Sequence, residues 1–188
     1  MSFELSQIGL VHANGQRALK SVTLAAQRGE RIAIIGPSGA GKTSMLRILA
    51  TSVRPIEGGV SVLGNHPWQK TGSELKQLRA RIGVVHPTLA DLSVNQLHHE
   101  AVTRGVTLVA SLHAVDIALR WFPRVVGIRA GEILFDLPAV KVTERVLRDL
   151  YRSETGVLPT QDNQPLTDLP ATARRELKLA NCAPPRLI

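Results

Sequence analysis

The residues best suited to chemistry stand together in a glycine-rich run from Gly36 to Thr43, with a lysine as its last residue but one. The glycines let successive backbone N–H groups turn inward and form a concave site for an anion. Lys42 supplies a mobile cation for terminal phosphates, and Thr43 offers a hydroxyl to Mg²⁺. The sequence therefore predicts a loop for a nucleoside triphosphate, built from Gly36, Pro37, Ser38, Gly39, Ala40, Gly41, Lys42, Thr43 and, as a further phosphate contact, Ser44.

This loop needs a strand before it and a helix after it. Residues 31–35 are almost wholly apolar, which is typical of a short strand buried on both faces. Residues 43–50 carry apolar side chains at helical spacing. The alternative is a chance glycine turn before a helix, and the complete motif in this context argues against it.

The remaining pattern alternates strands with helices. Such alternation predicts an α/β fold with a mostly parallel central sheet and flanking helices. A turn at residues 13–15 joins two early strands and adds an antiparallel N-terminal portion. Residues 92–96 look irregular. Further strands are predicted at 3–12, 22–25, 59–63, 82–85, 106–110, 124–129 and 132–137, and helices at 97–103, at 115–122, after a cap at Ser73 and after a cap at Thr143.

Composition limits the classes of protein that fit. The 188 residues suit one domain, and 44% hydrophobic with 20% charged residues is ordinary for a globular chain. The net charge is +8, but the basic residues are dispersed and aromatics amount to 3%, so no nucleic acid partner is expected. The single Cys182 cannot form an internal disulfide, and neither a secretory signal nor a membrane-spanning run is evident, so a cytoplasmic location is expected.

Two blocks of sequence resemble the ATP-binding subunits of ABC transporters, most closely those of phosphonate-type importers. The first runs from His12 to the glycine-rich loop, and the second runs from Gly105 to about Tyr151. In that family an aromatic residue stacks on adenine where this chain has His12; a solvent-facing histidine at a strand end is the equal alternative. The family's switch histidine contacts the γ-phosphate, so the resemblance gives His113 the role of sensor and transition-state stabiliser.

The resemblance also implies a setting for the chain. It implies a P-loop NTPase-like fold that binds ATP and Mg²⁺. It further implies a permease subunit as partner, a peripheral location on the inner face of the cell membrane, and a homodimer or a heterodimer with an intact ATPase subunit.

The chain departs from the family between Pro87 and His113. Only 26 positions separate these residues, where intact members carry a glutamine loop, a helical subdomain, an LSGGQ signature and an apolar strand ending Asp-Glu. Pro87 occupies the position of the glutamine. Residues 92–96 are better interpreted as the segment after that loop than as a decayed signature, because both signature glycines would be replaced by bulkier residues. Asp136 follows an apolar run and so looks like a Mg²⁺ ligand at the end of a strand. The family resemblance places it in the second strand of a hairpin, so we interpret it as structural.

These departures predict a truncated ABC-type nucleotide-binding domain over residues 1–154 that lacks the helical subdomain and is impaired in hydrolysis. Residues 155–188 are rich in Pro, Thr, Gln and Asp and predict a poorly ordered tail. Two alternatives stay open. One is a non-catalytic nucleotide-binding regulatory module. The other, less favoured because two strands precede the loop, is a small phosphotransferase of the nucleoside monophosphate kinase kind.

Overall fold

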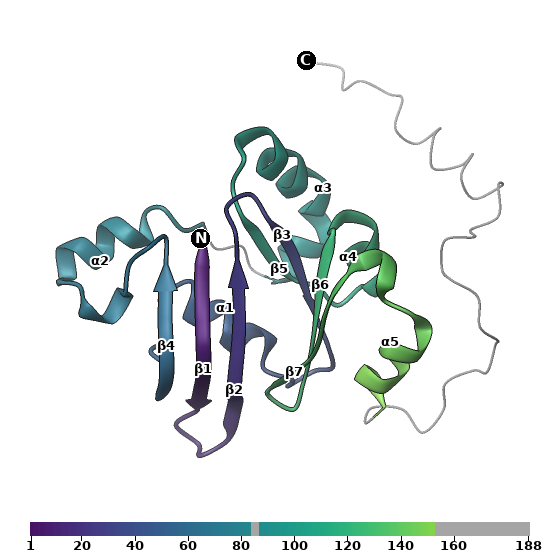
Figure 1. Cartoon of the computed structure of the whole chain (residues 1–188), viewed down its shortest axis with the longest axis horizontal. Helices are drawn as coiled ribbons and strands as arrows, with labels where there is room; N and C mark the ends of the chain where they lie inside the picture. The colour runs from purple at the N-terminus through teal and green to yellow at the C-terminus, as the bar shows by residue number, and fades with distance from the viewer. Residues whose placement is uncertain (84–86, 153–188) are drawn as a thin grey trace.

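A computed structural model describes residues 1–83 and 87–152, and for residues 87–93 it describes the backbone alone. The strands form two sheets, one with three strands in the order β2-β1-β4 and one with four in the order β5-β3-β6-β7 (Figure 1). The first sheet is antiparallel throughout, and the second is mostly parallel. The predicted α/β class with an antiparallel N-terminal portion is therefore confirmed.

The three-stranded sheet contains β1 (Phe3–Val11), β2 (Arg17–Ala26) and β4 (Glu57–Val62). The turn between β1 and β2 uses local chemistry, because the Asn14 side-chain oxygen accepts a hydrogen bond from the Gln16 N–H at 3.0 Å. Gly15 beside it has φ of 81°, which glycine adopts without steric cost. The antiparallel start of the chain follows from this turn.

The four-stranded sheet places β3 (Arg31–Ile35) at its centre. Parallel neighbours flank it on both sides, β5 (Leu108–Ser111) and β6 (Arg124–Arg129), and β7 (Glu132–Pro138) pairs antiparallel with β6. The side chains of residues 32–35 are all 0% exposed. Burial on both faces explains why this strand is an unbroken apolar run.

Two apolar clusters bury the faces of these sheets. The first joins the buried side chains of the N-terminal sheet and of α1 to β3, and the second joins β3 and β5 to the later helices. The helices are α1 (Lys42–Leu49), α2 (Gly72–Arg79), α3 (Pro87–Arg104), α4 (Val115–Trp121) and α5 (Glu144–Tyr151), with 3₁₀ turns at Pro67–Gln69 and Ala139–Lys141. In residues 1–83 and 87–152, no helix is both long enough and apolar enough to cross a bilayer.

Three local predictions differ from the structure. Residues 92–96 are helical and belong to α3, whose Val94 and Ala101 are both 3% exposed and share one face because seven residues separate them. Thr71 rather than Ser73 caps α2, because the Glu74 carboxylate accepts hydrogen bonds from both the N–H and the hydroxyl of Thr71. Ile82 and Gly83 are not in a strand, and the rest of the strand predicted at 82–85 lies outside the described residues.

The other predicted elements agree with the structure within a few residues. The cap at Thr143 is confirmed, since its hydroxyl accepts a hydrogen bond from the Val146 N–H at 3.4 Å. The helix predicted at 97–103 is the second half of α3. The predicted tail at 155–188 lies outside the described residues.

Candidate nucleotide-binding site

The glycine-rich loop connects the carboxyl end of β3, at Ile35, to the first residue of α1, Lys42. Parallel strands end at one edge of a sheet, so the loop stands where the ends of β3, β5 and β6 meet. Helix α1 directs its N-terminal N–H groups, and the positive end of its dipole, toward the same place. Strand, loop and helix thus give the arrangement that the motif requires.

Two loop positions admit only glycine. Gly36 has φ of 149°, and a Cβ there would lie 2.0 Å from the Ile128 carbonyl oxygen of β6. Gly41 has φ of 107°, and its Cβ would lie 2.6 Å from the Ala18 carbonyl oxygen of β2. Backbone conformation and close backbone neighbours therefore both exclude a side chain. The loop is held between β6 on one side and β2 on the other.

The turn between β6 and β7 holds the loop from outside. The Gly131 N–H donates to the Ala40 carbonyl at 3.0 Å, and the Lys20 N–H of β2 donates to the Gly131 carbonyl at 2.8 Å. The backbone of one residue, Gly131, thus ties the loop to the N-terminal sheet. Sequence reasoning predicted the hairpin and missed this contact, because no local pattern relates Gly131 to a loop ninety positions earlier.

Lys42 is buried, with 5% of its surface exposed, and lies within the loop. Its Nζ donates to the carbonyl oxygens of Gly36 at 2.6 Å and Pro37 at 2.7 Å. A buried ammonium is stable only where oxygen atoms replace its lost water. Phosphate oxygens can take over this role, so the amine stands where a polyphosphate would meet a charge-assisted donor.

The two hydroxyl residues after the lysine differ in exposure. Thr43 is exposed, so its hydroxyl is open to a metal ion or a phosphate. Ser44 is buried, and its Oγ lies 3.2 Å from Nε2 of His12. Of the other predicted loop residues, Ser38 and Gly39 are exposed and Pro37 and Ala40 are buried. Ser44 can contact phosphate only by sharing or giving up its interaction with His12.

His12 follows the last residue of β1 and has an exposed side chain that reaches the start of α1 through Ser44. The contact places the His12 imidazole beside the phosphate loop, although His12 and Ser44 are 32 positions apart in the sequence. Stacking of His12 on a base stays a prediction.

His113 lies at the same edge of the sheet as the loop. In the register of β5 with β3, Ser111 is the partner of Ile34, and the Leu112 N–H donates to the Ile34 carbonyl at 3.1 Å. His113 comes next, and its side chain is exposed. Its role as a γ-phosphate sensor stays a prediction, and this register is compatible with it.

Asp136, the acidic residue that follows an apolar run, lies away from the loop. Both carboxylate oxygens of Asp136 accept hydrogen bonds from Arg124, at 2.8 Å and 2.6 Å, and Arg124 begins β6 at the end of the sheet opposite the loop. Asp136 is therefore engaged in an ion pair, in agreement with its predicted structural role. Among the residues whose side chains are described, 1–83 and 94–152, no group of three His, Cys, Asp or Glu side chains could hold a metal ion. Beyond its backbone, Pro87 lies outside the described residues.

Comparison with known proteins gives consistent results. The family model for the ABC transporter matches residues 19–164. The chain is 40% identical to the phosphonates import ATP-binding protein PhnC 1 of Cupriavidus necator, over 92% of this chain and 95% of that protein. It is 35% identical to PhnC 2 of Pseudomonas aeruginosa, over 82% of this chain and 92% of that protein.

The alignment with the Cupriavidus protein runs over 265 positions, and the chain has 188 residues. At least 77 aligned positions, the difference between the two lengths, therefore fall opposite gaps in this chain. Such gaps agree with the short spacing between Pro87 and His113.

Solved structures share the fold at low sequence identity. CbiO1 of Clostridium perfringens, described as part of an ABC transporter complex, has a TM-score of 0.63 at 13% identity and covers 78% of this chain and 92% of its own. The ATP-binding cassette MJ0796, described as a dimer bound to ADP and phosphate, has a TM-score of 0.57 at 16% identity and covers 73% and 98%. At these identities the likeness shows the fold alone.

Proposed function

The chain belongs to the ABC transporter family, and from that membership we propose that it is the ATP-binding subunit of a phosphonate-type importer. In this role it binds Mg·ATP at residues 36–44 and docks on a permease at the cytoplasmic, inner face of the cell membrane. It pairs there with a second copy or with an intact ATPase subunit. The truncated ATP-binding domain comprises residues 1–154.

The observation that carries this proposal is the buried ammonium of Lys42 inside a loop where Gly36 and Gly41 leave no room for a side chain. Inward-turned backbone N–H groups and a lysine at a strand-to-helix corner suit a polyphosphate. The PhnC relatives, named as phosphonates import ATP-binding proteins, support the importer type. Thr43 would contact Mg²⁺, His12 would lie under the base, and His113 would sense the γ-phosphate.

We further propose that this chain hydrolyses ATP poorly. Hydrolysis needs a carboxylate in the metal shell and another to orient the attacking water. Asp136, the acidic residue that most resembles a metal ligand after a strand, is paired with Arg124 at the end of the sheet opposite the loop. Loss of a general base lowers a rate by about 10²–10⁴-fold. Binding does not depend on that base and would be retained.

The test compares ATP binding and hydrolysis in the full chain, the Lys42→Ala variant and a Lys76→Ala control. Lys76 is an exposed lysine of α2, so its loss matches the change in charge without touching the loop. Removing a charged hydrogen-bond donor costs roughly 1.5–3 kcal/mol, so the dissociation constant for Mg·ATP should rise roughly 10- to 150-fold in Lys42→Ala. Calorimetry measures binding, and phosphate release measures turnover.

The same experiment separates the alternatives. Brisk hydrolysis by the isolated chain would show that the proposed impairment is wrong. Phosphate transfer to added AMP or GMP would favour a kinase. Absence of saturable, Lys42-dependent heat would overturn the ATP-binding role itself.

Docking on a permease needs its own measurement. The chain should co-purify with a tagged phosphonate-type permease reconstituted in lipid nanodiscs. ATP binding without any association with the permease would favour the regulatory module over the transporter subunit.

A further inference from the structure

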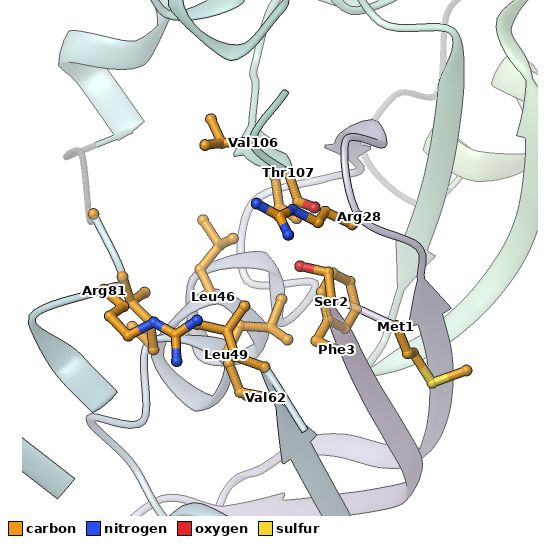
Figure 2. Close-up of a pocket in the computed structure, with 15 residues that line it drawn as sticks. Met1, Ser2, Phe3, Arg28, Leu46, Leu49, Val62, Arg81, Val106 and Thr107 are labelled. Carbon is orange, nitrogen blue, oxygen red and sulfur yellow. The ribbon is translucent and has the colours of Figure 1, made fainter. Parts of the chain in front are cut away.

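A cavity of about 550 Å³ lies apart from the nucleotide loop, between the second half of α1, the start of β1 and the segment that leads into β5. Its lining includes Leu46 and Leu49 of α1, Phe3 of β1 and Val109 of β5 (Figure 2). None of residues 36–44 takes part in it. Its volume is in the range of small-molecule sites in proteins.

The walls of the cavity are apolar and belong to the protein's own core. Phe3, Leu49 and Val62 are members of the first apolar cluster, and Leu46 and Val109 pack against it. Val106 stands at the rim and is 47% exposed. An apolar body in the cavity would therefore contact the core and cover the exposed part of Val106.

Two exposed arginines, Arg28 and Arg81, also line this cavity. Figure 2 shows the side chain of Arg28 on the side of Thr107 and Ser2, and that of Arg81 on the side of Leu46 and Leu49. In the described chain, the carboxylates that form ion pairs do so with other basic residues, and the guanidinium groups of Arg28 and Arg81 have no hydrogen-bonding or ion-pair partner there. Guanidinium groups are well suited to bind carboxylate or phosphate oxygens through paired hydrogen bonds.

Apolar walls with two cations fit one class of ligand. We propose that this cavity binds a small organic anion, in which a carboxylate or phosphate head meets Arg28 and Arg81 and an apolar body lies against Leu46, Leu49 and Val62. The Ser2 hydroxyl, in a residue that is 8% exposed, lies among the lining groups and can donate to the head. This site is independent of the proposed function, because it uses none of the loop residues.

The test uses the full chain and the fluorescent dye 8-anilinonaphthalene-1-sulfonate, an anion with an apolar body. Saturating Mg·ATP is present in one series and omitted in the other, so dye bound at the nucleotide loop is recognised. Octyl phosphate should displace the dye in both series. Octanol and inorganic phosphate, each carrying one half of the ligand, should displace it at least about tenfold less effectively.

Charge-matched variants locate the site. Arg28→Gln/Arg81→Gln should raise the dissociation constant for octyl phosphate by about tenfold or more. Arg47→Gln/Arg54→Gln removes two exposed arginines outside the cavity and should leave the constant unchanged. A second pair tests the apolar wall without disturbing the core. Val106→Glu, at the rim, should weaken binding, whereas Val102→Glu, 54% exposed on α3, should not.

Several results would overturn the proposal. Equal weakening in both arginine pairs would mean that octyl phosphate responds only to net charge. Displacement by octanol as effective as that by octyl phosphate would exclude a role for the guanidinium groups. Light scattering that showed a dimer at assay concentration, with dye binding lost on dimer formation, would assign this face to a second copy of the chain.

Discussion

At the scale of single residues, neighbouring backbone atoms leave no room for a side chain at two positions of the glycine-rich loop. The Ile128 carbonyl occupies the position that a Cβ on Gly36 would need, and the Ala18 carbonyl does the same at Gly41. Lys42 then fills the loop from inside through two short hydrogen bonds. The loop is therefore part of the folded core and contributes to stability as well as to binding.

We expect Gly36→Ala to destabilise the protein by on the order of 3 kcal/mol, since it combines an overpacked contact with an unfavourable positive φ. Gly15→Ala is the matched control. Gly15 also has a positive φ, of 81°, but nothing lies within 4 Å of the added methyl group, so only the backbone cost of about 1–2 kcal/mol applies. Urea denaturation measures both free energies of unfolding. Equal losses would show that the contact with Ile128 is unimportant.

Elements could be predicted from the sequence where local signals were strong. The apolar run before the loop, the Asn-Gly turn and the threonine cap at residue 143 each gave the observed structure. Residues 92–96 misled because helix α3 has little amphipathic pattern, and the burial of Val94 against a distant strand decides its structure. Such long-range contacts produce no pattern in the local sequence, so they cannot be predicted from it.

The phosphate loop of the site could be predicted from the sequence, but its contacts with distant segments could not. The loop residues follow from one continuous motif, whereas His113 was predicted from the family resemblance of the run around it. The contact of His12 with Ser44 and that of Gly131 with Ala40 join segments far apart in the chain, so sequence spacing could not reveal them. The guanidinium pair at Arg28 and Arg81 was missed for the same reason.

Helix α3 contacts β3 and α4 through the side chain of His98, which can gain or lose a proton. Arg31 of β3 lies with its guanidinium 2.9 Å from Nε2 of His98, and the His98 ring lies 5.4 Å from the ring of Trp121 in α4. Burial first, and then the nearby charge of Arg31, lower the pKa of His98 below its usual value. The neutral imidazole can accept from Arg31, whereas the protonated one cannot.

This arrangement predicts a loss of stability in mild acid. As the pH falls below about 6.5, the unfolded chain binds a proton at His98 before the folded chain does. The stabilisation by His98 is therefore complete above that pH and is lost as the pH falls through the lowered pKa of the folded state. His98→Gln should flatten the fall in the free energy of unfolding between about pH 7 and pH 5. Urea denaturation across this range measures it, and an unchanged slope would contradict the assignment.

At the scale of the whole molecule, Arg124 connects the two sheets. Its guanidinium donates to Glu30 at 2.6 Å, to Asp136 at 2.6 Å and to the Ala25 carbonyl of β2 at 3.0 Å. The hydrogen bond with Asp136 is the main cause that raises the pKa of Arg124 above its usual value. A cation held by two carboxylates and a carbonyl fixes how β2, β6 and β7 meet.

Arg124→Gln should therefore lower the free energy of unfolding by about 2 kcal/mol, because two half-buried carboxylates lose their partner. Arg17→Gln is the control. Its ion pair with Glu57 is exposed, with 47% and 55% of the side chains accessible, so the loss should stay below about 1 kcal/mol. Thermal and urea denaturation measure both. Similar losses in the two variants would mean that the connection between the sheets does not depend on this cation.

Gly131, whose N–H bonds the loop and whose carbonyl bonds β2, offers a reporter that is not itself a residue of the loop. Its amide hydrogen is shielded from deuterated solvent only while the loop keeps its shape. Exchange at this single amide, followed by NMR, would therefore register loop opening without a label on any residue that touches phosphate.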